Sequence, residues 1–222
     1  MNLLLYGLQR SGTNLLESLL RKNYRVRILN KNKTRSSPLQ KHFRLYDNKD
    51  IIPEPQYRNN LILPSYTDFE RVTGSNTDNI LIISKDPYSW LLSYRNWATR
   101  CGWPEVDYHY IEEYNLFYGK WLKYSKETSK IIFIRYIDIL EDAEKELSRL
   151  QSEIGLKRRI FYPFMSQTLK RRVPQSRKFS RLRRDYYLQE EYLKDYRSDE
   201  LHQINRLLDE NVISQLGYQI QS

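Results

Sequence analysis

The chain contains little cysteine and little histidine, and these shortages exclude several kinds of site. Its single cysteine, Cys101, cannot form an intramolecular disulfide or a thiolate metal cluster, which fits a reducing compartment. The three histidines, His42, His109 and His202, lie too far apart in the sequence for a metal-binding spacing. We therefore expect no metal site.

Long apolar runs are also missing. The longest, such as Leu3 to Tyr6, fall far short of the roughly 20 residues that cross a bilayer. The N-terminus lacks both the basic region and the small-residue cleavage site of a secretory signal. These absences predict a cytoplasmic protein without a membrane span.

Glycine and proline are scarce, at 7 and 8 residues, and hydrophobic residues make up 40% of the chain. This composition excludes collagen-like and disordered proteins. A length of 222 residues is that of one ordinary domain, so we expect residues 1–222 to form a single domain.

Positive charge is what the chain has in excess. Lysine and arginine number 37 against 27 acidic residues, which gives a net charge of +10. Residues 157–184 hold eleven of these cations and no acidic residue, so the rest of the chain carries −1. The excess points to an anionic partner: a nucleotide, a nucleic acid, an acidic saccharide or a membrane surface.

The apolar patterning predicts an α/β fold. Short apolar or alternating runs predict strands at residues 3–6, 26–29, 80–84 and 131–135. Helical periodicity recurs between and after them, at residues 15–22, 90–99, 111–126, 143–154 and 200–216. Strands that alternate with helices are typical of a parallel sheet flanked by helices. Residues 43–79 fit neither period and predict a long irregular excursion.

The first motif runs from Gly7 to Asn14, directly after the first strand and before a helix. A glycine loop in this position can bind phosphate through backbone N–H groups and the helix N-terminus. The glycines are spaced as in the nucleoside-triphosphate loop, GxxxxGK followed by Ser or Thr, but Thr13 occupies the lysine position. A kinase or ATPase would lose its central cation by this change. Arg10 lies inside the loop instead, where a guanidinium can bind two anionic oxygens.

The stretch from Arg10 to Leu16 resembles the 5′-phosphosulfate loop of the PAPS-dependent sulfotransferases. In that family, lysine or arginine and then serine or threonine precede Gly-Thr-Thr and an apolar helix. Asn14 stands where the family has its second threonine, and it keeps a hydrogen-bonding side chain. The resemblance implies that PAPS is bound by Arg10, Ser11, Gly12, Thr13, Asn14 and Leu15.

The second motif pairs a cation with a serine. Lys85 follows the strand at 80–84, precedes Asp86-Pro87, and lies eight residues before Ser93. The same register, with arginine in place of lysine, is found in the sulfotransferases. The resemblance implies that Lys85 and Ser93 bind the 3′-phosphate of PAPS, although lysine lacks the bidentate geometry of arginine. The structural alternative is a turn that only starts a helix.

The third motif contains the candidate base. The stretch from Lys41 to Asp47 is similar to segments of the heparan-sulfate and the cytosolic aryl and steroid sulfotransferases that carry an acidic or histidine base. Histidine has an unperturbed pKa near ~6.5, suited to accepting a hydroxyl proton. The resemblance therefore implies catalytic roles for His42, Lys41 and Arg10, with Lys41 near the transferring sulfuryl group. The carboxylates of the same region are alternative bases, namely Asp47, Asp50 and Glu54.

The C-terminal third carries weaker signals. Residues 132–142 and the ending Leu216-Gly217-Tyr218 resemble structural segments of the same family. Within the basic stretch 157–184, Lys170 and Arg172 loosely resemble a family loop that closes over the 3′-phosphate. A solvated basic face, or a patch for a polyanion, is the alternative.

Taken together, the resemblance implies a P-loop-like α/β fold and a sulfotransferase. It implies transfer of a sulfuryl group from PAPS to a hydroxyl or amine, without a metal, and release of 3′,5′-ADP. Heparan-like features favour a saccharide or glycolipid acceptor. The alternatives are a P-loop kinase and, less favoured, a nucleic-acid-binding module built on residues 157–184.

Overall fold

The computed structural model describes residues 1–31, 37, 39–43, 63–74, 76–102, 105–159 and 181–221. In this part of the chain every strand pairs parallel to its neighbour, in the order β2-β1-β4-β5, with β3 beside the end of β1. The strands are β1 (Asn2–Leu8), β2 (Arg27–Ile28), β3 (His42–Phe43), β4 (Asn79–Ser84) and β5 (Ile131–Arg135). The prediction of an α/β fold with a parallel sheet is confirmed.

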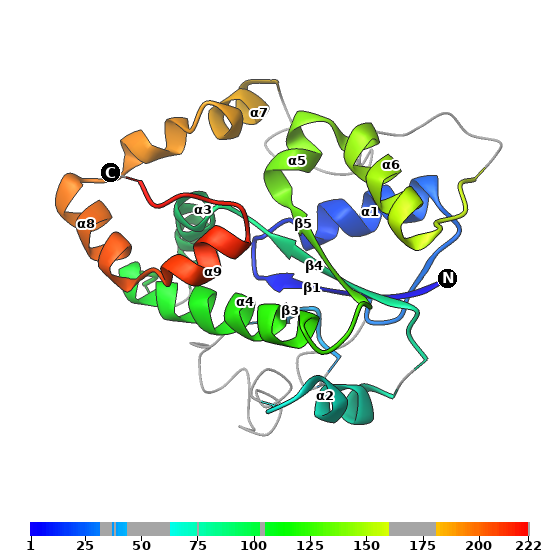
Figure 1. Cartoon of the computed structure of the whole chain (residues 1–222). Helices are drawn as coiled ribbons and strands as arrows, with labels where there is room; N and C mark the ends of the chain where they lie inside the picture. The colour runs from blue at the N-terminus through cyan, green and yellow to red at the C-terminus, as the bar shows by residue number, and fades with distance from the viewer. Residues whose placement is uncertain are drawn as a thin grey trace.

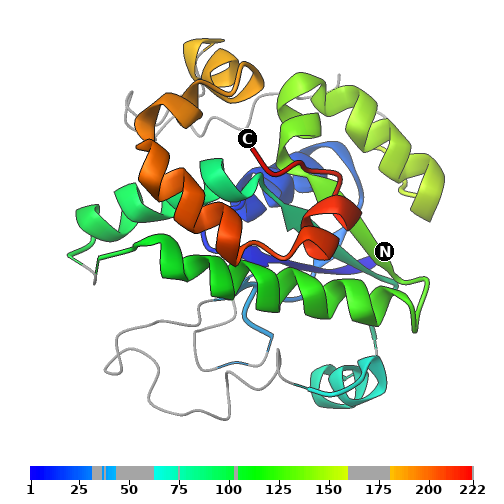
Figure 2. The same ribbon diagram turned by 60° about the vertical axis from the view of Figure 1, so that its left-hand side comes forward.

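Helices cover both faces of the sheet (Figure 1). One face packs against α1 (Thr13–Asn23) and α6 (Ala143–Ile154), and the other against α3 (Pro87–Arg100) and α4 (Ile111–Ser125). Side chains of β1 alternate between these layers because successive strand residues point to opposite faces: Leu3 and Leu5 pack toward α1, and Leu4 and Tyr6 toward α4. Figure 2 shows α4 and α6 on opposite sides of the sheet.

The layer beside α4 is rich in buried aromatic rings, and two of them support the end of β4. Tyr118 donates its hydroxyl to the carbonyl of Ile83 at 3.0 Å, and Tyr114 to the carbonyl of Lys85 at 2.8 Å. A buried backbone carbonyl needs such a donor where the strand pairing ends. The aromatic core therefore fixes the backbone that carries Lys85.

The remaining helical elements were predicted less well. The segment 200–216 is two helices, α8 (Ser198–Leu207) and α9 (Glu210–Gln215), and not one. Leu208 is extended, with φ −66° and ψ 133°, and the Asp209 carboxylate accepts hydrogen bonds from the backbone of Asn211 and Val212. Asp209 thus starts a new helix, because a capping carboxylate competes with helix continuation.

Several short helices had no counterpart in the prediction. The expected irregular excursion contains α2 (Tyr66–Thr73), which Ser65 caps by accepting the Asp68 N–H; residues 44–62 lie outside the described part. The others are α5 (Tyr136–Glu141), α7 (Arg181–Leu188) and the 3₁₀ helices η2 (Tyr108–Tyr110) and η4 (Glu191–Asp195). In the described ranges, the structure contains no helix with the length and apolar character of a membrane span.

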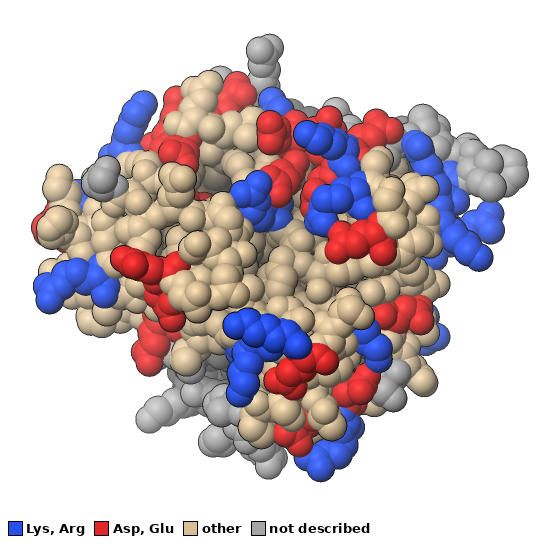
Figure 3. All heavy atoms as spheres, in the orientation of Figure 1, with Lys and Arg blue, Asp and Glu red and all other residues tan. Residues whose placement is uncertain are grey.

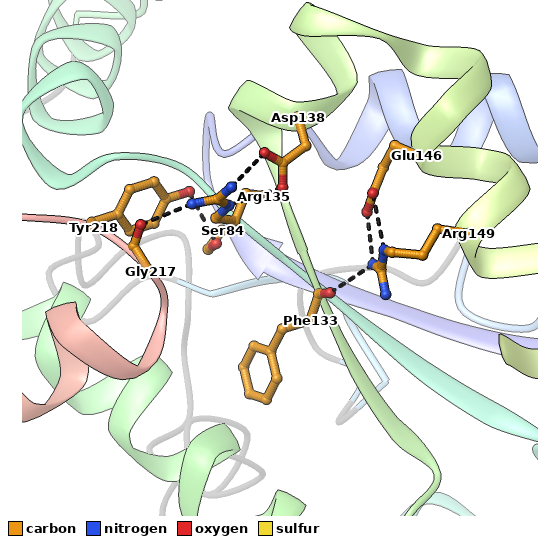
Figure 4. A network of polar contacts seen from close by, with 8 residues as sticks. All are labelled: Ser84, Phe133, Arg135, Asp138, Glu146, Arg149, Gly217 and Tyr218. Carbon is orange, nitrogen blue, oxygen red and sulfur yellow. Dashed lines mark hydrogen bonds and ion pairs between the residues drawn. The ribbon is translucent and has the colours of Figure 1, made fainter.

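The C-terminal residues are tied to the ends of the central strands (Figure 4). Arg135, the last residue of β5, donates to both carboxylate oxygens of Asp138, at 2.9 and 2.7 Å, and to the carbonyl of Gly217 at 2.8 Å. The Tyr218 hydroxyl lies 3.1 Å from that of Ser84, the last residue of β4. Nearby, Arg149 bridges Glu146 and the carbonyl of Phe133. The structural role predicted for the Leu-Gly-Tyr ending is confirmed.

Candidate functional site

The loop between β1 and α1 is tightly packed, which explains its glycines. A Cβ atom on Gly7 would overlap the Ser11 hydroxyl and lie 2.7 Å from the Thr13 methyl. Arg10 and Gly12 both have positive φ, at 75° and 103°. These left-handed residues turn the chain sharply from the strand into the helix. The indole N–H of Trp90 donates to the carbonyl of Gln9 at 2.9 Å and joins the loop to α3.

The first turn of α1 directly follows this loop, and among the described residues no side chain caps its N–H groups. The first N–H groups of a helix have no intrahelical acceptor, and they carry a partial positive charge. Ser11 adds no further donor to these N–H groups. Its own N–H donates to the carbonyl of Leu8 at 3.1 Å, and its side chain is fully buried. Ser11 therefore supports the loop and does not face the solvent side of it.

The three motifs meet at one pocket of about 140 Å³ at the carboxyl ends of the strands. Its lining residues are Gln9, Arg10, Gly12, Thr13, Asn14, Leu15, His42, Lys85, Ser93, Tyr136 and Tyr187. All of the described candidate residues line it except Ser11 and Lys41. The fold thus brings together the loop, the candidate base and the cation–serine pair, which are far apart in the sequence.

Lys85 and Ser93 line this pocket and contact each other directly. The Lys85 ammonium lies 2.5 Å from the Ser93 hydroxyl on α3, although the lysine side chain is almost wholly buried. The intervening Asp86-Pro87 turn also starts α3, since Asp86 accepts the Ser89 N–H at 2.9 Å and Pro87 is the first helical residue. The turn therefore starts a helix, as the structural alternative predicts, but Ser93 contacts Lys85 and so does not face the backbone or the solvent.

Two tyrosines that the sequence reasoning missed complete the surroundings of Lys85. The ammonium lies 4.3 Å from the ring centre of Tyr187 on α7 and 5.3 Å from that of Tyr136 on α5. A cation over an aromatic face is attracted by the ring quadrupole, which helps to hold a buried charge. Tyr136 lies within residues 132–142, for which the sequence predicts a structural role, and no motif in the sequence points to Tyr187.

His42 reaches the pocket because β3 pairs with the end of β1. His42 is opposite Gly7 in this pairing, and the Gly7 N–H donates to the carbonyl of Lys41 at 3.1 Å. The imidazole Nδ1 then lies 3.1 Å from the hydroxyl of Thr13, the first residue of α1. The pairing of β3 with β1 therefore holds the His42 side chain against the N-terminus of α1.

Lys41 takes a position that differs from the expected one. Its buried ammonium donates to the Glu17 carboxylate at 2.6 Å and to the Asn14 side-chain oxygen at 2.7 Å. Both partners belong to α1, and Lys41 lies beside the pocket and not in its lining. Because the Asn14 side-chain oxygen accepts from Lys41, the NH₂ group of the same amide remains as a donor, and it can donate to an anion. Lys41 thus orients Asn14.

The larger part of the basic stretch 157–184 lies outside the described residues, as do Lys170, Arg172, Asp47, Asp50 and Glu54. Two arginines of this stretch, Arg159 and Arg184, make structural contacts. Arg159 donates to the carbonyl of Tyr24 at 3.2 Å, and Arg184 donates to the last carbonyls of α5, at 2.6 Å to Leu140 and 2.7 Å to Glu141. Part of the excess charge therefore stabilises the fold.

A second, larger pocket of about 310 Å³ adjoins the first and shares Lys85, Tyr136 and Tyr187 with it. Its other walls include Arg135, Tyr192, Tyr218 and the side chain of Asp86. Burial raises the pKa of Asp86 to about 6, against the hydrogen bond from Ser89, which lowers it. Aromatic rings and hydrogen-bonding groups of this kind suit a planar heterocycle.

Cations do not form a continuous patch on the face that Figure 3 shows. Lysines and arginines are interspersed there with aspartates and glutamates among the described residues. A nucleic-acid surface would require a stripe of one sign. The described residues of that face form no such stripe.

No protein-family model matches the chain, and no curated protein matches it either. The case for a function therefore rests on the residues of this chain and on their arrangement.

Proposed function

We propose that this protein is a sulfotransferase that moves a sulfuryl group from PAPS to an acceptor hydroxyl or amine and releases 3′,5′-ADP. The observation that carries the proposal is the convergence of Arg10, His42 and the Lys85–Ser93 pair on one pocket. PAPS carries anionic groups at two separated positions, and the pocket offers one cation from the loop and another from the end of β4. The P-loop-like arrangement of β1, the loop and α1 belongs to the same proposal.

The donor would be held at three places. Arg10, the first N–H groups of α1 and the Asn14 amide bind the phosphosulfate, because each is a donor to anionic oxygens. Lys85 and Ser93 bind the 3′-phosphate. The adenosine occupies the adjoining pocket of about 310 Å³, where the rings of Tyr136 and Tyr187 offer stacking surfaces. Lys170 and Arg172 would add cations to the 3′-phosphate.

The reaction is an in-line displacement at sulfur. The acceptor oxygen forms the new S–O bond, the bond between sulfur and the bridging phosphate oxygen breaks, and His42 accepts the acceptor proton. Arg10 offsets the charge that develops on the bridging oxygen of the leaving 3′,5′-ADP. Lys41 acts as a positioning residue through Asn14 and does not contact the transferred group. A saccharide or glycolipid remains the acceptor that we propose.

The kinase alternative finds less support. Thr13, the first residue of α1, occupies the position at which a triphosphate-binding loop has its lysine. The loop places a different cation, Arg10, in the lining of the pocket. A kinase would bind ATP together with magnesium. The site that we propose binds the phosphosulfate and the 3′-phosphate of PAPS through side chains and backbone N–H groups.

Thermal unfolding in the presence of nucleotides tests the proposal. We expect 3′,5′-ADP to raise Tm without magnesium, 5′-AMP to raise it less, and ATP with magnesium to have little effect. A response confined to ATP with magnesium would favour the kinase. Salt-sensitive binding of DNA or RNA, with no response to 3′,5′-ADP, would favour the nucleic-acid module.

Product analysis then tests the reaction itself. The protein is incubated with PAPS and a panel of hydroxyl and amine acceptors, and the products are examined by mass spectrometry for the added sulfuryl mass. The His42→Ala variant is the matched control. Absence of any sulfated product across saccharide, glycolipid and phenolic acceptors, together with no response to 3′,5′-ADP, contradicts the proposal.

A further inference from the structure

The contact between Thr13 and His42 links the start of α1 to the candidate base. The Thr13 hydroxyl lies 3.1 Å from the imidazole Nδ1, and both residues line the pocket of about 140 Å³. Thr13 is itself buried, and its methyl group packs against Gly7. The packed methyl group restricts rotation about χ1 of Thr13, and the hydroxyl is thereby kept toward His42.

This hydrogen bond has two possible proton arrangements. A hydroxyl has one proton to donate, and a neutral imidazole carries its proton on only one of its nitrogens. If Thr13 donates to Nδ1, the imidazole proton resides on Nε2. If Thr13 accepts from Nδ1–H, then Nε2 has the lone pair and can accept a proton. The direction of one hydrogen bond therefore decides whether Nε2 is a base.

A bound anion favours the second arrangement. An anionic oxygen in the pocket accepts hydrogen bonds, and a bond to an ionised acceptor is roughly twice as strong as one between neutral groups. The Thr13 hydroxyl then donates to the anion, and its lone pair is available to accept from His42 Nδ1–H.

We propose that Thr13 couples occupancy of the pocket by a phosphate or sulfate group to the tautomer of His42, so that Nε2 becomes a base only after the anionic donor has bound. The inference rests on the proposed function, because it takes His42 as the base and the pocket as the anion site. It makes Thr13 a positioning residue and implies that the donor binds before the acceptor is deprotonated.

Nitrogen NMR of the full chain with ¹⁵N-labelled histidine tests the coupling directly. Nδ1 and Nε2 of a neutral imidazole have different shifts in the two tautomers, so the spectra are recorded at about pH 8.5, above the ordinary histidine pKa of ~6.5. We expect saturating inorganic pyrophosphate, or 3′,5′-ADP, to shift His42 toward the Nδ1–H tautomer by about tenfold in the tautomer ratio. His109 and His202 are internal controls, and the His42→Gln variant assigns the signal.

Variants of Thr13 separate the relay from simple proximity to the anion. Thr13→Val keeps the branched shape and removes the hydroxyl, so the anion should no longer shift the tautomer. Thr13→Ser restores a hydroxyl and should restore the shift. An unchanged tautomer in the wild-type protein with the anion bound, as verified by Tm, overturns the proposal, and this result needs no variant. The same shift in Thr13→Val overturns it as well.

The coupling and the sulfotransferase assignment fail in different ways. If pyrophosphate shifts the tautomer but no acceptor is sulfated, the coupling stands and the sulfotransferase assignment falls. If acceptors are sulfated while the tautomer is constant, only the coupling falls. If neither pyrophosphate nor 3′,5′-ADP binds, both fall.

Discussion

The ammonium of Lys85 lies 2.5 Å from the hydroxyl of Ser93, at the point where the end of β4 meets α3. This buried lysine also lies 4.3 Å from the ring centre of Tyr187, so a hydroxyl and a π face both stabilise its charge. A buried ammonium in this position can form a charge-assisted hydrogen bond with an anionic ligand that enters the pocket.

Replacing Lys85 should therefore weaken binding of the 3′-phosphate. A charge-assisted hydrogen bond contributes about 1.5–3 kcal/mol, so we expect Lys85→Met to weaken 3′,5′-ADP binding by about 10- to 100-fold. Binding of 5′-AMP, which lacks the 3′-phosphate, should change much less. Calorimetric titration of both nucleotides measures this, with the exposed Lys126→Met as the control. Equal losses for the two nucleotides would argue against contact with the 3′-phosphate.

Removal of the candidate base should separate catalysis from binding. We expect His42→Ala to abolish sulfuryl transfer while 3′,5′-ADP still raises Tm as in the wild type, because Arg10 and Lys85, which we propose as the nucleotide-binding cations, are unchanged. Turnover is followed by release of 3′,5′-ADP from PAPS with an accepted acceptor. Unchanged turnover would discard His42 as the base and direct attention to the carboxylates at 47, 50 and 54.

The pairing of Lys41 with Glu17 predicts a large effect on stability. Lys41→Met leaves the Glu17 carboxylate, whose side chain is 9% exposed, without the ammonium at 2.6 Å. Breaking a buried ion pair in this way costs about 3–5 kcal/mol. The double variant Lys41→Met/Glu17→Gln removes both charges and should recover most of the stability in urea unfolding.

The same double variant tests the positioning role of Lys41. Because it lacks the donor to the Asn14 oxygen, we expect weaker binding of pyrophosphate even though stability is recovered. Wild-type affinity in the double variant would mean that Lys41 contributes only to stability.

Gly7 and Gly119 should respond differently to alanine. Gly7→Ala places a Cβ atom 2.7 Å from the Thr13 methyl and 2.8 Å from that of Ile83, so we expect destabilisation by about 1–3 kcal/mol. Gly119→Ala lies within α4 with its nearest neighbour at 3.4 Å, and helix propensity should make it neutral or up to about 1 kcal/mol stabilising. Denaturant unfolding measures both. Equal effects would contradict the packing of the β1–α1 loop.

Asp86 predicts a specific dependence of stability on pH. Its folded pKa, about 6, exceeds its ordinary value of 3.8, so the folded state holds the proton more tightly than the unfolded state does. The associated stability is present below pH 3.8 and is lost as pH rises through about 6. Asp86→Asn keeps a side-chain oxygen for the Ser89 N–H and removes the buried charge.

The free energy of unfolding of Asp86→Asn should therefore exceed that of the wild type by a margin that grows between about pH 4 and pH 7, on the order of 2 kcal/mol. Urea unfolding at a series of pH values measures the difference. A difference that is constant across this range would mean that burial does not raise the pKa of Asp86.

Much of the fold was readable in the sequence because its signals are local. The apolar runs around Leu4, Ile82 and Ile132 are buried strands as predicted, and α6 has the predicted bounds. The failures also have local causes that a hydrophobic period does not register. Asp209 caps a new helix inside an unbroken apolar pattern, and Ser65 starts α2 within a stretch that has no clear period.

The candidate site was partly readable for the same reason. The order of glycines, Arg10 and Thr13 follows from the turn that the loop must make, and the spacing of Lys85 and Ser93 follows from a strand end and a helix. Tyr187 carried no signal, because its contact with Lys85 depends on how α7 lies against the ends of the strands.

The sequence by itself determined which residues are chemically capable of binding an anionic donor, since residue type and spacing are written in it. Only the tertiary structure decided what each of them contacts. It set His42 against Thr13 through the pairing of β3 with β1, and it placed the Lys41 ammonium on Glu17 and Asn14, beside the pocket and not in its lining. The physical reason is that hydrogen bonds and ion pairs depend on distances of a few ångströms between residues far apart in the chain, and only the packed sheet and helices fix those distances.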